Sequence, residues 1–214
     1  MDSEKQNIDA MPVDTLIISD ADIDEGKVTI AHKQVTSGDF IDLGLSAMWA
    51  SCNLGATKPQ ESGGYFAFGE LKEKDEYTLE TYAYKTSAYG YTKAKSIGSD
   101  IKGTEYDVVT TTLGENYRMP TREEVKELIL ECEWKKHKLD GVEGMLVTGK
   151  NGNSIFIPEV GYKEGLRIGG VSYYWTSNHD ISSCSKALYI GYEGADINST
   201  LSYIGCPIRP VKTK

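Results

Sequence analysis

Apolar residues occur in short runs along this chain, separated by polar ones. In only one stretch do they recur with the period of a helix. Its apolar members fall at i, i+3, i+4 and i+7, on one face of a helix, and are Val125, Leu128, Ile129 and Cys132. Thr121 precedes this stripe and Glu124 follows three residues later, which is the pattern of a capping box. We therefore predict one clear helix, over about residues 121–133.

Most of the remaining apolar runs are short and bounded by turn residues, which is typical of strands. Residues 145–148 and 154–157 flank an Asn-Gly pair at 151–152, a strong signal for a hairpin. Further strands are predicted near 47–53, 64–69, 173–176, 187–190 and 206–211. Residues 70–105 have no clean period, and we expect a long surface excursion packed by its tyrosines. Short strands, little helix and long loops predict an α+β fold with mostly antiparallel strands.

The polarity of the chain divides it into three parts. Residues 1–12 are polar and are expected to form a disordered tail. Residues 13–36 contain two short apolar runs around an acidic turn at 20–26, and we expect a strand pair or arm. The acidic turn has no glycine and no distal glutamate at the spacing of an EF-hand calcium loop, so we interpret it as solvated. The main domain is predicted over 37–214.

The charge and composition of the chain argue against nucleic-acid partners and membrane spans, but they do not determine where in or outside the cell the protein is located. The chain has 214 residues and a formal net charge of -9. An acidic surface repels phosphate backbones, so we expect no nucleic-acid partner. No apolar run approaches the roughly 18–20 residues of a membrane span. The first residues show no signal peptide, so an extracellular or cell-surface protein would have a leader outside this sequence. A phage particle or an intracellular location is the alternative.

The four cysteines do not predict a metal centre. None forms a CxxC pair and no histidine lies at zinc-ligand spacing, so we expect no metal and no cofactor. Cys132 lies on the apolar stripe of the helix, and Cys52 follows an apolar strand. We expect both to be small buried hydrophobic residues. Cys184 and Cys206 both lie in the last third of the chain. The sequence does not decide whether they form a disulfide.

Several motifs, taken in order, resemble those of one family. They are DLGLSAMWASCNLGAT at 42–57, GGYFAFGE at 63–70, IKGTEYD at 101–107, YRMPT at 117–121, NGNSIFIP at 151–158, GY at 161–162, YWTS at 174–177 and IRPV at 208–211. Over about residues 39–211 the chain resembles the Fibrobacter succinogenes major paralogous domain, which is common in surface proteins of gut Bacteroidetes. The resemblance implies a C-type-lectin-like fold of the formylglycine-generating-enzyme type. The chain is also similar to retroelement-diversified variable proteins, in which the last forty or so residues carry changeable side chains on a fixed scaffold.

Residues 162–206 are rich in Tyr, Ser, Asn, Gly and Asp, a mixture that is typical of recognition loops. Tyrosine offers a rigid amphipathic ring that suits protein contacts and the apolar faces of sugars. Alternation along 187–192 places Leu188 and Ile190 on one face of a strand and Tyr189 on the other. The candidate ligand-binding residues are Tyr162, Tyr173, Asn178, His179, Asp180, Tyr189, Tyr192, Asp196, Asn198, Ser202 and Tyr203.

Enzymatic patterns are weaker than this binding pattern. His179 lies beside Asp180, but no nucleophile motif accompanies them. We expect a non-enzymatic module that binds a glycan or a protein on a cell surface. One alternative is a retroelement-diversified, phage-encoded receptor-binding protein; another is an assembly domain in which residues 13–36 pair with a second chain. Arg118 and Arg209 are expected to pair inside the fold, and the oligomeric state is left open.

Overall fold

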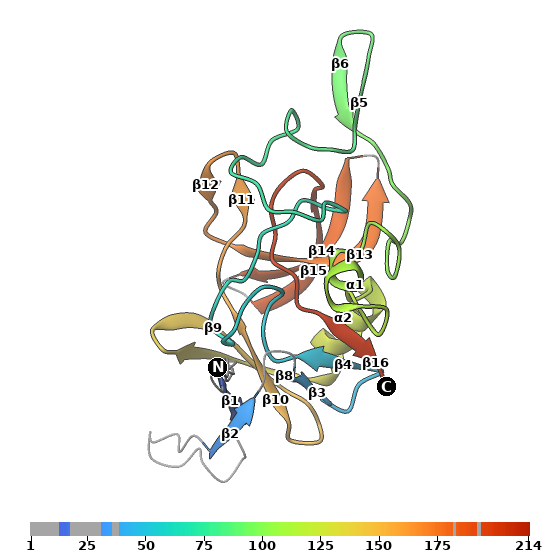
Figure 1. The fold of residues 1–214 in the computed structure, drawn as a ribbon. Helices are drawn as coiled ribbons and strands as arrows, with labels where there is room; N and C mark the ends of the chain where they lie inside the picture. Colours follow the sequence, from blue (N-terminus) through green and yellow to red (C-terminus); the bar gives the residue numbers. More distant parts are fainter. Residues whose placement is uncertain (1–12, 18–30, 36–38, 182, 192–193) are drawn as a thin grey trace, which may run out of the picture.

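The structure is a computed structural model that describes residues 13–17, 31–35, 39–181, 183–191 and 194–214 (Figure 1). Every strand pairing in these ranges is antiparallel, and two helices accompany the strands, so the predicted α+β class is confirmed. The predicted tail at 1–12, the acidic turn at 20–26 and Tyr192 lie outside the described residues. No described helix has the length and apolar character to cross a membrane.

The strands form three larger sheets and three two-stranded pairs. The four-stranded sheet has the order β3 (Phe40–Ile41), β4 (Ala47–Ala50), β16 (Val211–Thr213) and β7 (Tyr117–Arg118). One three-stranded sheet consists of β8 (Glu133–Leu139), β9 (Val142–Thr148) and β10 (Ser154–Pro158), and the other of β13 (Ser172–Ile181), β14 (Cys184–Gly191) and β15 (Gly194–Leu201). The pairs are β1 (Val13–Ile17) with β2 (Ala31–Val35), β5 (Lys85–Ala88) with β6 (Tyr91–Ala94), and β11 (Lys163–Glu164) with β12 (Arg167–Ile168).

The predicted helix is α2 (Arg122–Glu131), and its N-terminal capping box is confirmed. The Glu124 N–H donates to the Thr121 hydroxyl at 3.2 Å, and the Thr121 N–H donates to the Glu124 carboxylate at 2.8 Å. The predicted C-terminal end at 133 is wrong, because Cys132 is extended and Glu133 begins β8. Arg118 forms a bidentate pair with the same glutamate, at 2.8 and 2.6 Å, so its predicted internal pairing is confirmed.

The second helix, α1 (Val108–Leu113), was not predicted. Its sequence, VVTTTL, consists mostly of β-branched residues, which have low helix propensity. Asp107 caps the helix and accepts hydrogen bonds from the backbone N–H groups of Val109 and Thr110. The cap and the burial of Val108 and Val109 outweigh the unfavourable local preference.

Three apolar clusters hold the sheets together. The first packs α2 against β4, β9, β10 and one face of the β13–β15 sheet. The second surrounds Trp175, whose indole N–H donates to the Phe66 carbonyl at 2.7 Å. The third contains the fully buried Tyr77 and Tyr82, which confirms that tyrosines pack the excursion over 70–105. Phe66 pairs with Cys206 only as an isolated bridge, so no strand forms at the predicted 64–69.

All four cysteines are free in the structure. Cys184 and Cys206 therefore do not form the disulfide that the sequence left open. Cys206 is fully buried, and burial raises the pKa of its thiol well above the usual value. It behaves as a small core residue.

The β5–β6 hairpin stands away from the body of the molecule (Figure 1). Its turn contains a non-glycine residue with a positive φ. Tyr89 and Gly90 have φ values of 51° and 78°, the positive pair of a type I′ turn, and the Tyr89 side chain is 100 % exposed. A tyrosine in this conformation costs about 1 kcal/mol relative to the asparagine that such turns favour. We expect Tyr89→Asn to slow amide exchange in the hairpin about fivefold. Tyr91→Asn, at a strand position, is the control and should give no protection; equal exchange in both variants would contradict the strain.

Candidate functional site

Three of the predicted tyrosines lie side by side: Tyr173 and Tyr189 on the β13–β15 sheet, and Tyr162 in the segment just before β11. Tyr173 on β13 lies opposite Tyr189 on β14, which lies opposite Asp196 on β15. The ring centroids of Tyr173 and Tyr189 are 5.4 Å apart, and those of Tyr162 and Tyr173 are also 5.4 Å apart. We call Tyr162, Tyr173 and Tyr189 the tyrosine row. All three side chains are half-buried, so each keeps a face open to solvent.

The opposite face of β14 is buried, which fixes the orientation of the row. Leu188 and Ile190 are each 1 % exposed and belong to the core cluster under α2. Side chains alternate between the faces of a strand, so Tyr189 points away from this core. The orientation predicted from the sequence is confirmed.

Two glycines leave room for the outer rings of the row. A Cβ at Gly169 would lie 2.3 Å from Cε1 of Tyr162, and one at Gly191 would lie 2.2 Å from the Tyr189 hydroxyl oxygen. Both rings therefore lie against backbone that has no side chain. This contact restricts their motion, so a ligand would meet rings whose positions are already set.

Asp196 and Asn198 supply polar groups beside the row. They are two residues apart on β15 and therefore share one face of the sheet. Asp196 is exposed, and Asn198 is half-buried opposite Ala187. Rings, a carboxylate and an amide gather on this surface.

The other predicted residues of the sheet form a polar network at its far end. His179 Nδ1 lies 3.1 Å from the Ser185 hydroxyl, which lies 2.9 Å from the Ser202 hydroxyl. Ser202 is 1 % exposed, and its hydroxyl belongs to this internal network. Ser185 is 0 % exposed, so the His179–Ser185 pair presents no nucleophile to a substrate.

The remaining candidates have structural partners. The Asn178 side-chain oxygen accepts the Arg122 N–H at 2.7 Å and so holds the first turn of α2. Asp180 pairs with Lys186 at 3.1 Å and also accepts the Ser199 hydroxyl. Tyr203 is half-buried between two apolar clusters. These residues support the sheet. Tyr162 and Tyr173 also pack against the second apolar cluster, and the exposed part of the tyrosine row is what a ligand could contact.

The half-buried position of His179 predicts a loss of stability in mild acid. Its ring stacks on Phe68, and its Nε2 has no hydrogen-bond partner. Desolvation lowers the pKa of His179 below its usual 6.5, while Asp180 opposes this shift. The unfolded chain therefore takes up the proton first as the pH falls through about 6.5, and the free energy of unfolding decreases below that pH.

We expect His179→Gln to remove this dependence, which urea unfolding at pH 7.5 and 5.5 would measure. The loss in the parent chain should stay below about 1 kcal/mol, because the ring is partly exposed and solvent screens its charge. His137→Gln on β8 is the control. A parent chain equally stable at both pH values would contradict the prediction.

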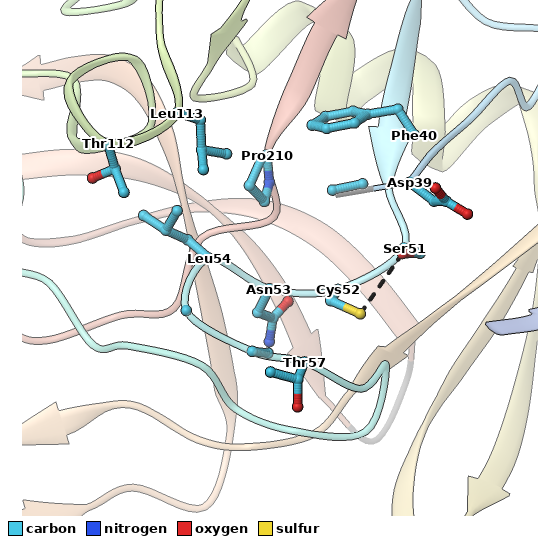
Figure 2. A pocket seen from close by; sticks show the side chains of 13 residues that line it. Asp39, Phe40, Ser51, Cys52, Asn53, Leu54, Thr57, Thr112, Leu113 and Pro210 are labelled. Carbon is cyan, nitrogen blue, oxygen red and sulfur yellow. Dashed lines mark hydrogen bonds between the residues drawn. The ribbon is translucent and has the colours of Figure 1, made fainter. Parts of the chain in front are cut away.

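The sequence did not single out two exposed features. Tyr91, like Tyr89, lies at the end of the β5–β6 hairpin and is 80 % exposed. A cleft also lies beside the loop that follows β4, lined by residues from four separate segments (Figure 2). No group of three or more His, Cys, Asp or Glu among the described residues is arranged to hold a metal ion.

Comparison of the chain with protein-family models, with curated proteins and with solved structures found no match. The geometry of the tyrosine row and the motifs of the sequence are therefore the basis for a functional proposal.

Proposed function

We propose that the protein is a non-enzymatic binding module that recognises a glycan or a protein at a cell surface through the tyrosine row. The contact of three half-buried rings, two of them on one face of the β13–β15 sheet, carries this proposal. Tyrosine rings stack on the apolar faces of sugars and anchor protein contacts. Asp196 and Asn198 would take the polar groups of such a ligand.

The order of the sequence motifs also suggests a fold for this binding module. It supports a C-type-lectin-like domain over residues 37–214, in which the last third of the chain displays recognition residues on a fixed scaffold. The buried Leu188 and Ile190, with the half-buried Tyr189 between them on the other face, agree with that division. The retroelement-diversified receptor-binding protein is a special case of the same proposal. It requires a near-copy of the 3′ end of the gene beside a reverse-transcriptase gene.

The assembly domain is the competing proposal. The β1–β2 pair is the element that would join another chain, since its strands pair only with each other among the described strands. Sedimentation of the full chain and of residues 37–214 separates the two proposals. The same mass for both would count against assembly through this pair.

A glycan array, followed by cell binding with and without protease treatment, tests the tyrosine row. We expect Tyr189→Ala to weaken binding by roughly 1–2 kcal/mol, which is the loss of one aromatic anchor. The matched control is Tyr91→Ala, which removes an exposed tyrosine outside the row. Equal effects of the two variants, or none from Tyr189→Ala, would remove the row from the binding surface.

A further inference from the structure

The cleft beside β4 has the size and the walls of a small-ligand site. Its volume is about 330 Å³, and its apolar walls include Phe40, Leu54, Leu113 and Pro210 (Figure 2). Pockets for small ligands begin near 300 Å³ and are mostly apolar with a few polar groups. Leu113 is 42 % exposed, which is high for a leucine at the end of a helix. The cleft shares no residue with the tyrosine row.

One wall of the cleft carries an acceptor that the fold leaves unsatisfied. The Asn53 side chain is 2 % exposed, and its oxygen has no hydrogen-bond partner. Its nitrogen donates to the carbonyls of Glu61 and Ser62 at 3.3 and 3.0 Å, which fixes which way the amide points. In Figure 2 the oxygen points to the side of Cys52 and Pro210, and the nitrogen points away. A buried acceptor without a donor is destabilising, and a donor from a ligand would remove that cost.

The other polar groups of the cleft favour a cation. Asp39 lines it with a half-buried carboxylate that forms no ion pair within the described part of the chain. No lysine or arginine lines the cleft; the buried Arg209 guanidinium lies behind its wall, where it donates to the carbonyls of Ala50 and Phe156. Burial raises the pKa of Cys52, so its thiol adds no negative charge at neutral pH. The remaining polar side chains, from Ser51, Thr57 and Thr112, are hydroxyls.

We propose that this cleft binds a compact aromatic amine whose ring carries an N–H or O–H group. The ring would lie against Leu54, Leu113 and Pro210. The ring donor would meet the oxygen of Asn53, and the ammonium group would lie near Asp39. A flat apolar body, one donor and one positive charge are the three properties that these walls select.

Three indoles can serve as probes that test these properties one at a time. Tryptamine has all three, 1-methyltryptamine lacks the ring N–H, and tryptophol replaces the ammonium by a hydroxyl. We expect saturable shifts of the amide resonances of residues 39–57 in ¹H–¹⁵N spectra of the full chain with tryptamine. Loss of the ring N–H should weaken binding about fivefold, the value of one net hydrogen bond. Loss of the charge should weaken binding in low salt, with a smaller difference at 1 M salt.

Two variants test the walls. Leu113→Gln should weaken all three probes, whereas Leu71→Gln, at a leucine of 43 % exposure outside the cleft, should change none. Asp39→Asn should remove the advantage of tryptamine over tryptophol. Equal binding of the three indoles, shifts outside the cleft, or equal effects of the two leucine variants would overturn the site. None of these results depends on whether the tyrosine row binds a ligand.

Discussion

Asp107→Asn will lower the free energy of unfolding by about 3–5 kcal/mol, although the two side chains have nearly the same shape. Asp107 is 0 % exposed, and its carboxylate oxygens accept four backbone N–H groups. The donors belong to Gly103 at 3.0 Å, Val109 at 3.0 Å, Thr110 at 3.2 Å and Met119 at 3.0 Å. An asparagine keeps one oxygen and turns an NH2 group toward the donors that faced the other. Each buried donor left without an acceptor costs about 1–3 kcal/mol.

Chemical denaturation measures the loss, and Asp42→Asn is the matched control. Asp42 also accepts a backbone N–H, that of Gly44 at 2.8 Å, but its side chain is 46 % exposed. Water replaces a lost bond there, so the control should lose much less stability than Asp107→Asn. A loss from Asp107→Asn no larger than that of the control would contradict the assigned role.

Asp107 also joins three segments that are separate in the chain. It caps α1, holds the turn at Gly103 and accepts the N–H of Met119, just before the loop that enters α2. Amide exchange in Asp107→Asn should therefore quicken at Met119 as well as at the helix. Faster exchange confined to α1 would mean that the residue acts only as a cap.

The elements that the sequence predicted well depend on neighbours in the chain. The α2 capping box needs only Thr121 and Glu124, three residues apart, and the β9–β10 hairpin needs only its Asn-Gly turn. The signals for α1 were equally local but pointed the wrong way. Its helix forms because Asp107 and a buried valine pair stabilise β-branched residues that favour strands.

The candidate site was predictable only in part, for the same physical reason. Alternation along β14 gave the outward face of Tyr189, but the row also requires the register that sets Tyr173 opposite it. Ser202 carries no local sign of its burial, since Ser185 reaches it from another strand. The cleft beside β4 is lined by residues from four segments, among them Phe40, Leu113 and Pro210. A pattern of neighbouring residues in the sequence cannot predict that such distant segments come together.

Arg209 connects two sheets, and its substitution is the second change that we expect to lower the stability of the fold strongly. It is 1 % exposed, and it donates to the Ala50 carbonyl on β4 at 3.2 Å and to the Phe156 carbonyl on β10 at 2.8 Å. Its predicted pairing inside the fold is confirmed, with carbonyls in place of a carboxylate. Burial lowers the pKa of Arg209, but a guanidinium keeps its proton in proteins. The fold therefore contains a buried cation that two carbonyl dipoles stabilise.

We expect Arg209→Ala to cost about 4–5 kcal/mol and Arg209→Met about 2–3 kcal/mol, as measured by denaturant unfolding. Both variants leave the two carbonyls without their donor, but methionine fills most of the volume and removes the cost of burying the charge. Arg167→Ala, at an exposed arginine on β12, is the control and should change stability by less than about 0.5 kcal/mol. If methionine were as stable as arginine, the two hydrogen bonds would give no net stabilisation, and apolar packing alone would hold β4 against β10.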